Sequence, residues 1–131
     1  QIDKVRPPYN VNVLTRIAVE FALNHFSEFR TQAEQLKANR ESMAGALKSL
    51  ANPMGAMEVF DSCANFILFR LPKALEVFEA LKNKGILVKY VGKAHPLLAD
   101  CLRVTVSTAQ ENQQFLDALK ECIVELADKA A

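Results

Sequence analysis

One long periodic segment constrains the fold of this 131-residue chain more than any other feature. Between about residues 28 and 51, apolar side chains recur at alternating steps of four and three residues, which places them on one stripe of an α-helix. The members of this stripe are Phe29, Ala33, Leu36, Met43, Leu47 and Leu50, and Arg40 alone interrupts it. The segment covers only about three heptads, so we expect a long helix packed on a domain rather than a coiled-coil strand.

Turn and cap signals divide the rest of the chain into further elements. Two adjacent prolines near the start predict an extended connector, and we expect helices at about 13–25, 72–85 and 108–127 and strands at 57–61, 65–70, 86–90 and 102–107. Thr108 and Glu111 form a capping-box pattern at the start of the last helix. The predicted order is α-α-β-β-α-β-β-α, an α+β fold in which a small, mainly antiparallel sheet of about four strands is covered by helices.

The composition excludes several classes of partner. Sixteen basic and fifteen acidic residues leave a formal charge of +1, so no global field attracts nucleic acid or an anionic membrane, and any anion site must be local. No apolar run approaches the roughly 20 residues that span a bilayer. The sequence begins with Gln1 rather than methionine, so we expect it to be part of a longer protein.

Neither the cysteines nor the histidines form a ligand pattern. The three cysteines are widely spaced and lack a C-x-x-C pair, which indicates reduced thiols and a cytoplasmic location. His25 and His95 have no carboxylate or cysteine neighbours at ligand spacing, so we predict no metal site. The sequence also contains no glycine-rich phosphate loop and no identifiable Ser-His-Asp set.

The stretch "CLRVTVST" at 101–108 carries an arginine inside an otherwise uncharged strand. Alternation places Arg103 and Thr105 on the face opposite Leu102 and Val104. If this strand pairs with 86–90 so that Val88 lies near Val104, Lys89 faces Arg103, and two like charges in that position favour an anion between them. A solvated polar face explains the same pattern, and both interpretations remain open.

Other polar residues are weaker candidates. Asn65 opens a strand after a turn, where its amide serves the turn or faces the same cleft as Arg103. Arg6, Tyr9 and Asn10 are crowded into the connector, where they meet solvent or contact another domain or subunit.

Four segments resemble one known family in order and spacing. They are "KVRPPYNVN" at 4–12, "ANFILFR" at 64–70, "GILVK" at 85–89 and "HPLLADCLRVTVSTAQEN" at 95–112. Together they are similar to the C-terminal portion of the histidinol-phosphate aminotransferases, a family of fold-type-I pyridoxal-phosphate enzymes. Such enzymes have a large domain that holds the cofactor and a small domain that closes on the substrate.

The resemblance implies a division of the chain and a set of roles. Residues 1–27 would be the connector and first helix leading from a large domain outside this sequence, and 28–131 the small substrate-closing domain. Arg103 would bind the phosphate of histidinol phosphate in one half-reaction and the carboxylate of glutamate in the other, with Lys89 and Asn65 as further substrate contacts. Arg6, Tyr9 and Asn10 would lie near a subunit interface.

The resemblance also implies what this chain lacks. In this family the Schiff-base lysine and the residues that bind pyridoxal 5'-phosphate lie upstream, so we expect no catalytic residue, no bound cofactor and no activity in these 131 residues alone. The full-length protein would be a homodimeric transaminase of histidine biosynthesis. Two alternatives stay open: a stand-alone α+β module that binds a small anionic effector, and an interaction domain built on the 28–51 stripe.

Overall fold

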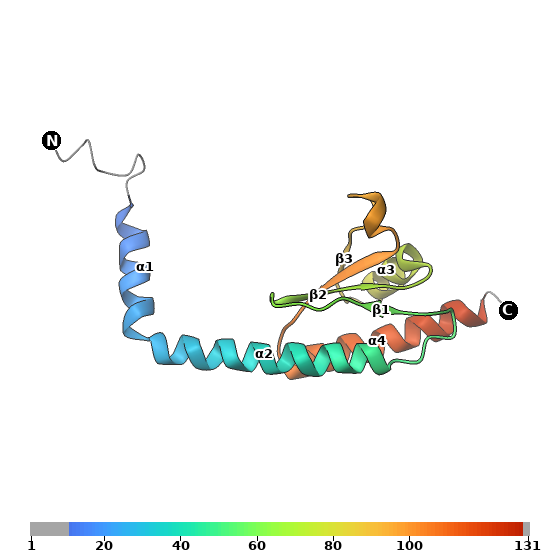
Figure 1. Cartoon of the computed structure of the whole chain (residues 1–131), viewed down its shortest axis with the longest axis horizontal. Helices are drawn as coiled ribbons and strands as arrows, with labels where there is room; N and C mark the ends of the chain where they lie inside the picture. The colour runs from blue at the N-terminus through green and yellow to red at the C-terminus, as the bar shows by residue number, and fades with distance from the viewer. Residues whose placement is uncertain (1–10, 130–131) are drawn as a thin grey trace. The chain divides into compact units, whose positions relative to one another are not determined.

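The computed structural model of the chain describes residues 11–129 (Figure 1). Its elements are α1 (Val13–Asn24), α2 (Phe26–Ser49), β1 (Glu58–Val59), β2 (Phe66–Arg70), α3 (Ala74–Asn83), β3 (Lys89–Tyr90), the short 3-10 helix η2 (Pro96–Leu98), β4 (Cys101–Thr105) and α4 (Ala109–Asp128). The predicted order of helices and strands and the α+β class are confirmed.

The chain divides into two compact units between Glu34 and Gln35, inside α2. The first unit contains α1, which begins where the Asn12 side chain accepts a hydrogen bond from the Thr15 backbone N–H at 2.8 Å. No residue of α1 is buried. The boundary expected between 27 and 28 stays a prediction about the domains of the full-length protein.

The second unit is built on a four-stranded antiparallel sheet with the order β1-β2-β4-β3. The central pair is β2 with β4, which runs from Phe66 opposite Thr105 to Arg70 opposite Cys101. The residues that face the helices are fully or almost fully buried, namely Ile67, Phe69, Leu102, Val104 and Val106. This sheet face forms the floor of the hydrophobic core.

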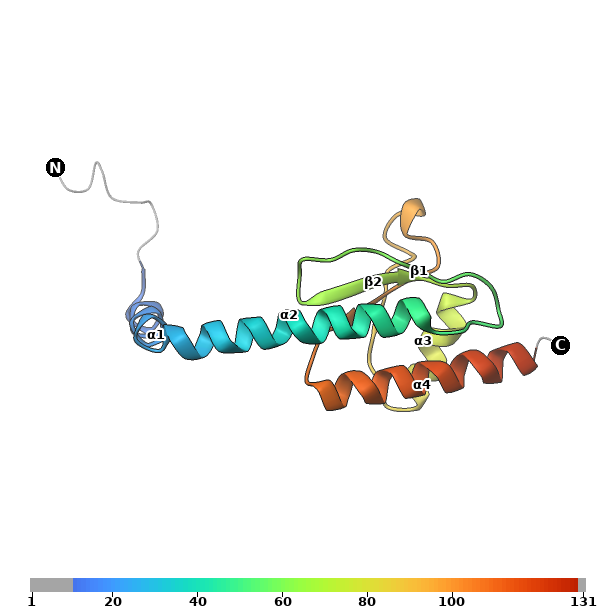
Figure 2. The same cartoon turned by 60° about the horizontal axis from the view of Figure 1, so that its bottom comes forward.

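Three helices complete the core. The C-terminal part of α2 and α4 lie side by side on the same side of the sheet (Figures 1 and 2). Their buried residues, together with those of α3, are Met43, Leu47, Ala74, Val77, Leu81, Phe115, Leu119, Cys122 and Ile123. The predicted stripe of α2 is therefore core at Met43 and Leu47, whereas Leu36 and Phe29 remain exposed.

The predicted cap of α4 is confirmed. The Thr108 side chain accepts from the Glu111 backbone N–H, and the Glu111 carboxylate accepts from the Thr108 backbone N–H. Gly85 ends α3, as expected, in a left-handed conformation with φ +80°.

The third strand is shorter than predicted. We expected 86–90, but only Lys89 and Tyr90 pair with β4. The reason is local: the backbone N–H of Ile86 donates to the carbonyl of Leu81 in the last turn of α3, so the chain after Gly85 first closes the helix end.

Candidate anion site on the open face of the sheet

Two cations face each other on the side of the sheet that the helices of its unit leave uncovered. Lys89 of β3 and Arg103 of β4 are direct cross-strand partners, which is the register that the sequence analysis left open. Arg103 is half-buried and Lys89 is exposed. Like charges directly opposite each other destabilise a strand pair unless an anion lies between them.

Neither cation is neutralised by its surroundings. Within residues 11–129, no hydrogen bond or ion pair involves the side chain of Arg103 or Lys89. The guanidinium carbon of Arg103 lies 5.0 Å from the centre of the Phe66 ring, and this aromatic face accepts no conventional hydrogen bond. The donors of both cations are thus available to a ligand.

Arg70, on the same face of the sheet, behaves in the opposite way. Its guanidinium donates to the Glu58 carboxylate at 2.6 Å, to the Leu97 carbonyl at 2.7 Å and to the Ala99 carbonyl at 3.2 Å. The last two of these bonds tie the η2 segment to the end of β2. Because its donors are used within the chain, Arg70 is a structural residue and Arg103 is the candidate ligand-binding arginine.

The other predicted site residues are not brought to this pair. The backbone carbonyl of Asn65 accepts from the Val106 N–H at 2.8 Å, and alternation along β2 assigns the Asn65 side chain to the face of Ile67 rather than that of Arg103. Arg6, Tyr9 and Asn10 lie outside the described residues.

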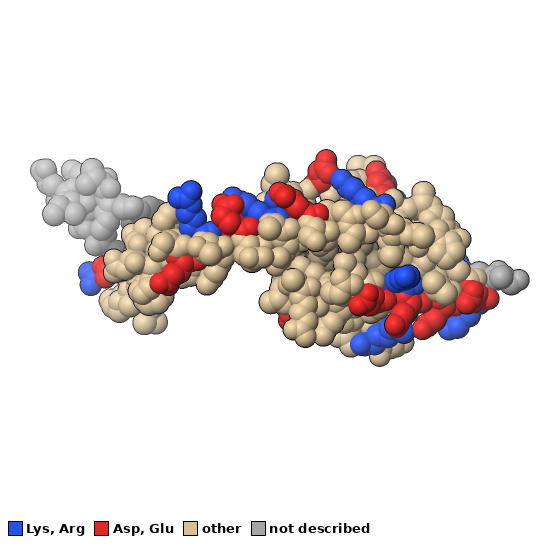
Figure 3. All heavy atoms as spheres, turned by 90° about the horizontal axis from the view of Figure 1, so that it is seen from below, with Lys and Arg blue, Asp and Glu red and all other residues tan. Residues whose placement is uncertain are grey.

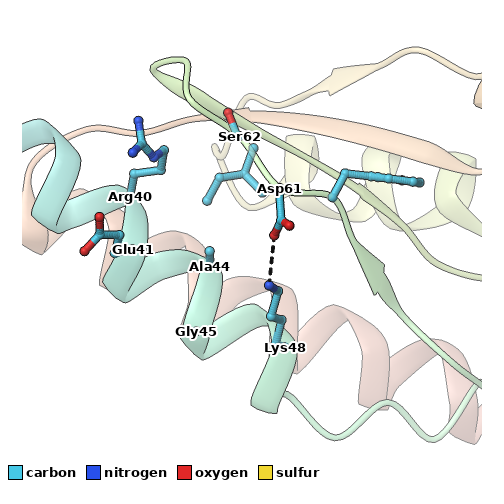
Figure 4. A pocket seen from close by; sticks show the side chains of 9 residues that line it. Arg40, Glu41, Ala44, Gly45, Lys48, Asp61 and Ser62 are labelled. Carbon is cyan, nitrogen blue, oxygen red and sulfur yellow. Dashed lines mark hydrogen bonds and ion pairs between the residues drawn. The ribbon is translucent and has the colours of Figure 1, made fainter.

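A concavity lies between α2 and the turn after β1 (Figure 4). It has a volume of about 400 Å³, and Lys48 at its rim pairs with Asp61 at 3.2 Å. The Arg40 guanidinium donates to the Ala64 carbonyl at 3.3 Å, and Glu41 lines the same hollow. Two cations and two carboxylates balance, so this hollow offers no excess charge to an anion.

Other chemistry is sparse in the described part of the chain. No group of three or more His, Cys, Asp or Glu side chains there is arranged to hold a metal ion. Cys101 and Cys122 are buried, and burial raises the pKa of the Cys122 thiol, which makes it a poor nucleophile. On the face that Figure 3 shows, acidic side chains form a short row at the lower right, with basic side chains beside it. Lys84 pairs with two acidic residues of α4, Glu121 and Glu125. Among the helices of residues 11–129, none combines the length and apolar character that crossing a bilayer requires.

Comparison with known protein families shows to which family the chain belongs. The sequence pattern of the aminotransferase class I and II family matches residues 1–119. The chain belongs to this aminotransferase family. Among its relatives, histidinol-phosphate aminotransferase 2 of Cupriavidus pinatubonensis is 52% identical over 118 residues, which are 90% of this chain and 31% of that protein. The chain therefore spans about a third of the length of such relatives.

Solved structures support the fold of the aminotransferase chain. The histidinol-phosphate aminotransferase from Clostridium acetobutylicum superimposes with a TM-score of 0.77 and 21% identity, over 92% of this chain and 36% of that one. The L-threonine-O-3-phosphate decarboxylase from Porphyromonas gingivalis gives 0.68 and 29%, over 88% of this chain and 35% of that one. Both likenesses fit a domain within a larger protein.

Two residues on the sheet face of Arg103 and Lys89 were not predicted from the sequence as part of the site. Phe66 was seen only as part of an apolar strand, and Arg70 was not singled out. Alternation assigns both to the face of Arg103, but only the β2–β4 register shows that Phe66 lies diagonally across from it.

Proposed function

We propose that this chain is the C-terminal, substrate-binding domain of a pyridoxal-phosphate-dependent histidinol-phosphate aminotransferase. The full-length protein would convert histidinol phosphate and 2-oxoglutarate to imidazole-acetol phosphate and glutamate in histidine biosynthesis. The observation that carries this proposal is the facing pair of Arg103 and Lys89, without an acidic partner, in a chain that is 52% identical to a histidinol-phosphate aminotransferase.

The two cations suit the two substrates. A guanidinium presents parallel N–H donors that match two oxygens of a phosphate or a carboxylate, so Arg103 would bind the phosphate in one half-reaction and the carboxylate in the other. Lys89 adds a point charge on the opposite strand, which suits the higher charge of the phosphate. Asn65, which alternation assigns to the opposite face of the sheet, would contact the substrate only from the turn beyond the first residue of β2.

The described residues do not fit the cofactor itself. A Schiff-base lysine needs an enclosed site, but every lysine within residues 11–129 is exposed, and Lys84 is already paired with Glu121 and Glu125. Pyridoxal phosphate would therefore be held by another part of the full-length protein, where it supplies the electron sink for the reaction.

The contribution of this chain is orientation and exclusion of water. Closure over the substrate would place Arg103 and Lys89 on its anionic end and remove water from around them, which strengthens both contacts. The large domain of the same chain, and a second subunit contacted by Arg6, Tyr9 and Asn10, would complete a cytoplasmic homodimer.

The decisive experiment uses the full-length protein. We expect transamination of histidinol phosphate with 2-oxoglutarate, and Arg103→Lys should lower kcat/KM for both substrates by roughly 10- to 150-fold, because one charged hydrogen bond contributes about 1.5–3 kcal/mol. Arg40→Lys is the matched control and should leave kcat/KM near the wild-type value. An unchanged kcat/KM for histidinol phosphate in Arg103→Lys would contradict the assignment.

A calorimetric titration separates this function from that of a stand-alone anion-binding module. The isolated 131-residue chain should bind inorganic phosphate negligibly, because two cations on an open sheet face are surrounded by water and their attraction is weak there. Measurable binding that Arg103→Ala abolishes would favour the module.

A further inference from the structure

The aromatic ring of Phe66 contacts the Arg103 guanidinium, and no other aromatic or hydrogen-bonding group of residues 11–129 does so. We propose that Phe66 is a positioning residue that holds this guanidinium ready for the anionic end of the substrate. The inference rests on the binding role proposed above for Arg103, and it assigns that role a supporting side chain.

The geometry of the sheet places the ring beside the guanidinium. Phe66 begins β2 and pairs with Thr105, so it lies diagonally across from Arg103 on the same sheet face. The distance of 5.0 Å from the guanidinium carbon to the ring centre is within the roughly 6 Å over which a cation is attracted to an aromatic face. Both side chains are half-buried, which strengthens the attraction relative to an exposed pair.

The kind of contact matters as much as its strength. A guanidinium carries its five N–H groups at its planar edge, and a hydrogen-bonding partner would use some of them. An aromatic face restrains the same group without using any. Phe66 therefore orders Arg103 while all of its donors remain free for a phosphate or a carboxylate.

The two neighbours of β4 act on Arg103 from opposite sides. Phe66 lies on β2 and attracts the guanidinium, while Lys89 lies on β3 and repels it until an anion binds. Without the ring, the Arg103 side chain would sample more rotamers, and more conformational entropy would be lost when an anion binds. Loss of the ring should therefore weaken anion binding and leave the rate of the chemical step unchanged.

Arg70 and Phe60 provide a matched control on the same sheet. The guanidinium carbon of Arg70 lies 5.2 Å from the Phe60 ring, almost the same distance as in the proposed pair. However, three hydrogen bonds already fix Arg70, so loss of the Phe60 ring should leave its position unchanged.

The test compares Phe66→Leu, Phe66→Tyr and Phe60→Leu in the full-length holoenzyme. For Phe66→Leu we expect a roughly three- to tenfold rise in KM for histidinol phosphate and in the Kd of inorganic phosphate, with kcat nearly unchanged. Phe66→Tyr keeps an aromatic face and should restore both values, and Phe60→Leu should match the wild type. If Phe66→Leu is unstable in thermal denaturation, Phe66→Met keeps more of the side-chain volume and replaces it.

Each outcome separates this inference from the proposed function. Equal phosphate Kd values in the wild type and in a folded Phe66→Leu or Phe66→Met would overturn the positioning role, and so would a Phe66→Tyr variant that fails to recover. A wild-type protein that binds phosphate through Arg103 but does not transaminate histidinol phosphate would overturn only the proposed substrate. If wild-type phosphate binding is insensitive to Arg103→Ala, both are wrong.

Discussion

Glu111 shows how one carboxylate can organise the junction between a strand and a helix. It accepts hydrogen bonds from the Ser107 hydroxyl and from the Thr108 hydroxyl and backbone N–H, at the point where β4 leads into α4. These donors hold the pKa of the Glu111 carboxyl below its ordinary value near 4.5. The ionised form is therefore bound more favourably in the folded chain than in the unfolded chain.

This lowered pKa predicts an acid dependence of stability. A carboxyl whose folded-state pKa is depressed contributes stability that is present above its ordinary pKa and is lost as the pH falls through the folded value. We expect the thermal midpoint to fall as the pH drops below about 4.5, and Glu111→Gln should make that fall shallower. Glu41→Gln, at an exposed position of α2, is the control. An identical pH profile in Glu111→Gln and the wild type would rule out this role for Glu111.

The residues that could be predicted from sequence are those whose role depends on local spacing. The Thr108–Glu111 cap follows from a three-residue separation, and the face shared by Arg103 and Thr105 follows from strand alternation. Which cation meets which partner depends on register and on distant loops. The carbonyl groups of Leu97 and Ala99 that bind Arg70 come from a segment about 30 residues away, and no local pattern encodes them.

At the scale of elements, the same glycine substitution should have opposite effects in two places. Gly45 lies within α2, and a Cβ added there meets nothing within 4 Å. Gly45→Ala should therefore raise the free energy of unfolding by about 0.5–1 kcal/mol, because alanine loses less backbone entropy in a helix. Gly85 follows α3 with φ +80°, a left-handed conformation that is unfavourable for alanine. Gly85→Ala should therefore lower the free energy of unfolding by about 1–2 kcal/mol.

Urea unfolding of the 131-residue chain measures both changes. The shared chemistry of the two substitutions makes each the control for the other. A lower free energy of unfolding in Gly45→Ala would contradict the first prediction, because it would mean that the added methyl group clashes with a neighbouring group. An unchanged free energy of unfolding in Gly85→Ala would contradict the second, because it would mean that the backbone at the end of α3 can leave the left-handed conformation at no cost.

The elements themselves follow from sequence except where two of them compete for one segment. The span 86–90 has strand composition, yet its first residue is held by the end of α3, and pairing begins only at Lys89. Strand propensity is a property of each residue taken separately. The backbone carbonyl groups at the end of a helix need hydrogen-bond donors, and here the residues after α3 provide them before the chain joins the sheet.

At the scale of the whole molecule, buried and exposed apolar residues are distributed unevenly along the chain. Every buried hydrophobic residue of residues 11–129 lies between Met43 and Ile123, whereas α1 buries none of its own. Its exposed apolar side chains include Leu14, Ile17 and Phe21. A helix with this composition is expected to be covered in the full-length protein, since large exposed apolar patches mark contact surfaces.

In the isolated chain, the apolar side chains of α1 should therefore be exposed to solvent and should not contribute to the stability of the core. We expect it to bind a hydrophobic dye or to self-associate at high concentration, as measured by fluorescence and by sedimentation. The double substitution Leu14→Gln and Ile17→Gln should reduce both signals without lowering the thermal midpoint, because neither side chain is buried. Leu47→Gln is the matched control, because this residue is fully buried, and it should cost about 3 kcal/mol or more by placing an amide in the core. If the α1 variant lowers the midpoint by several degrees, α1 contributes to the stability of the sheet unit, and its apolar face is part of the fold rather than a contact surface.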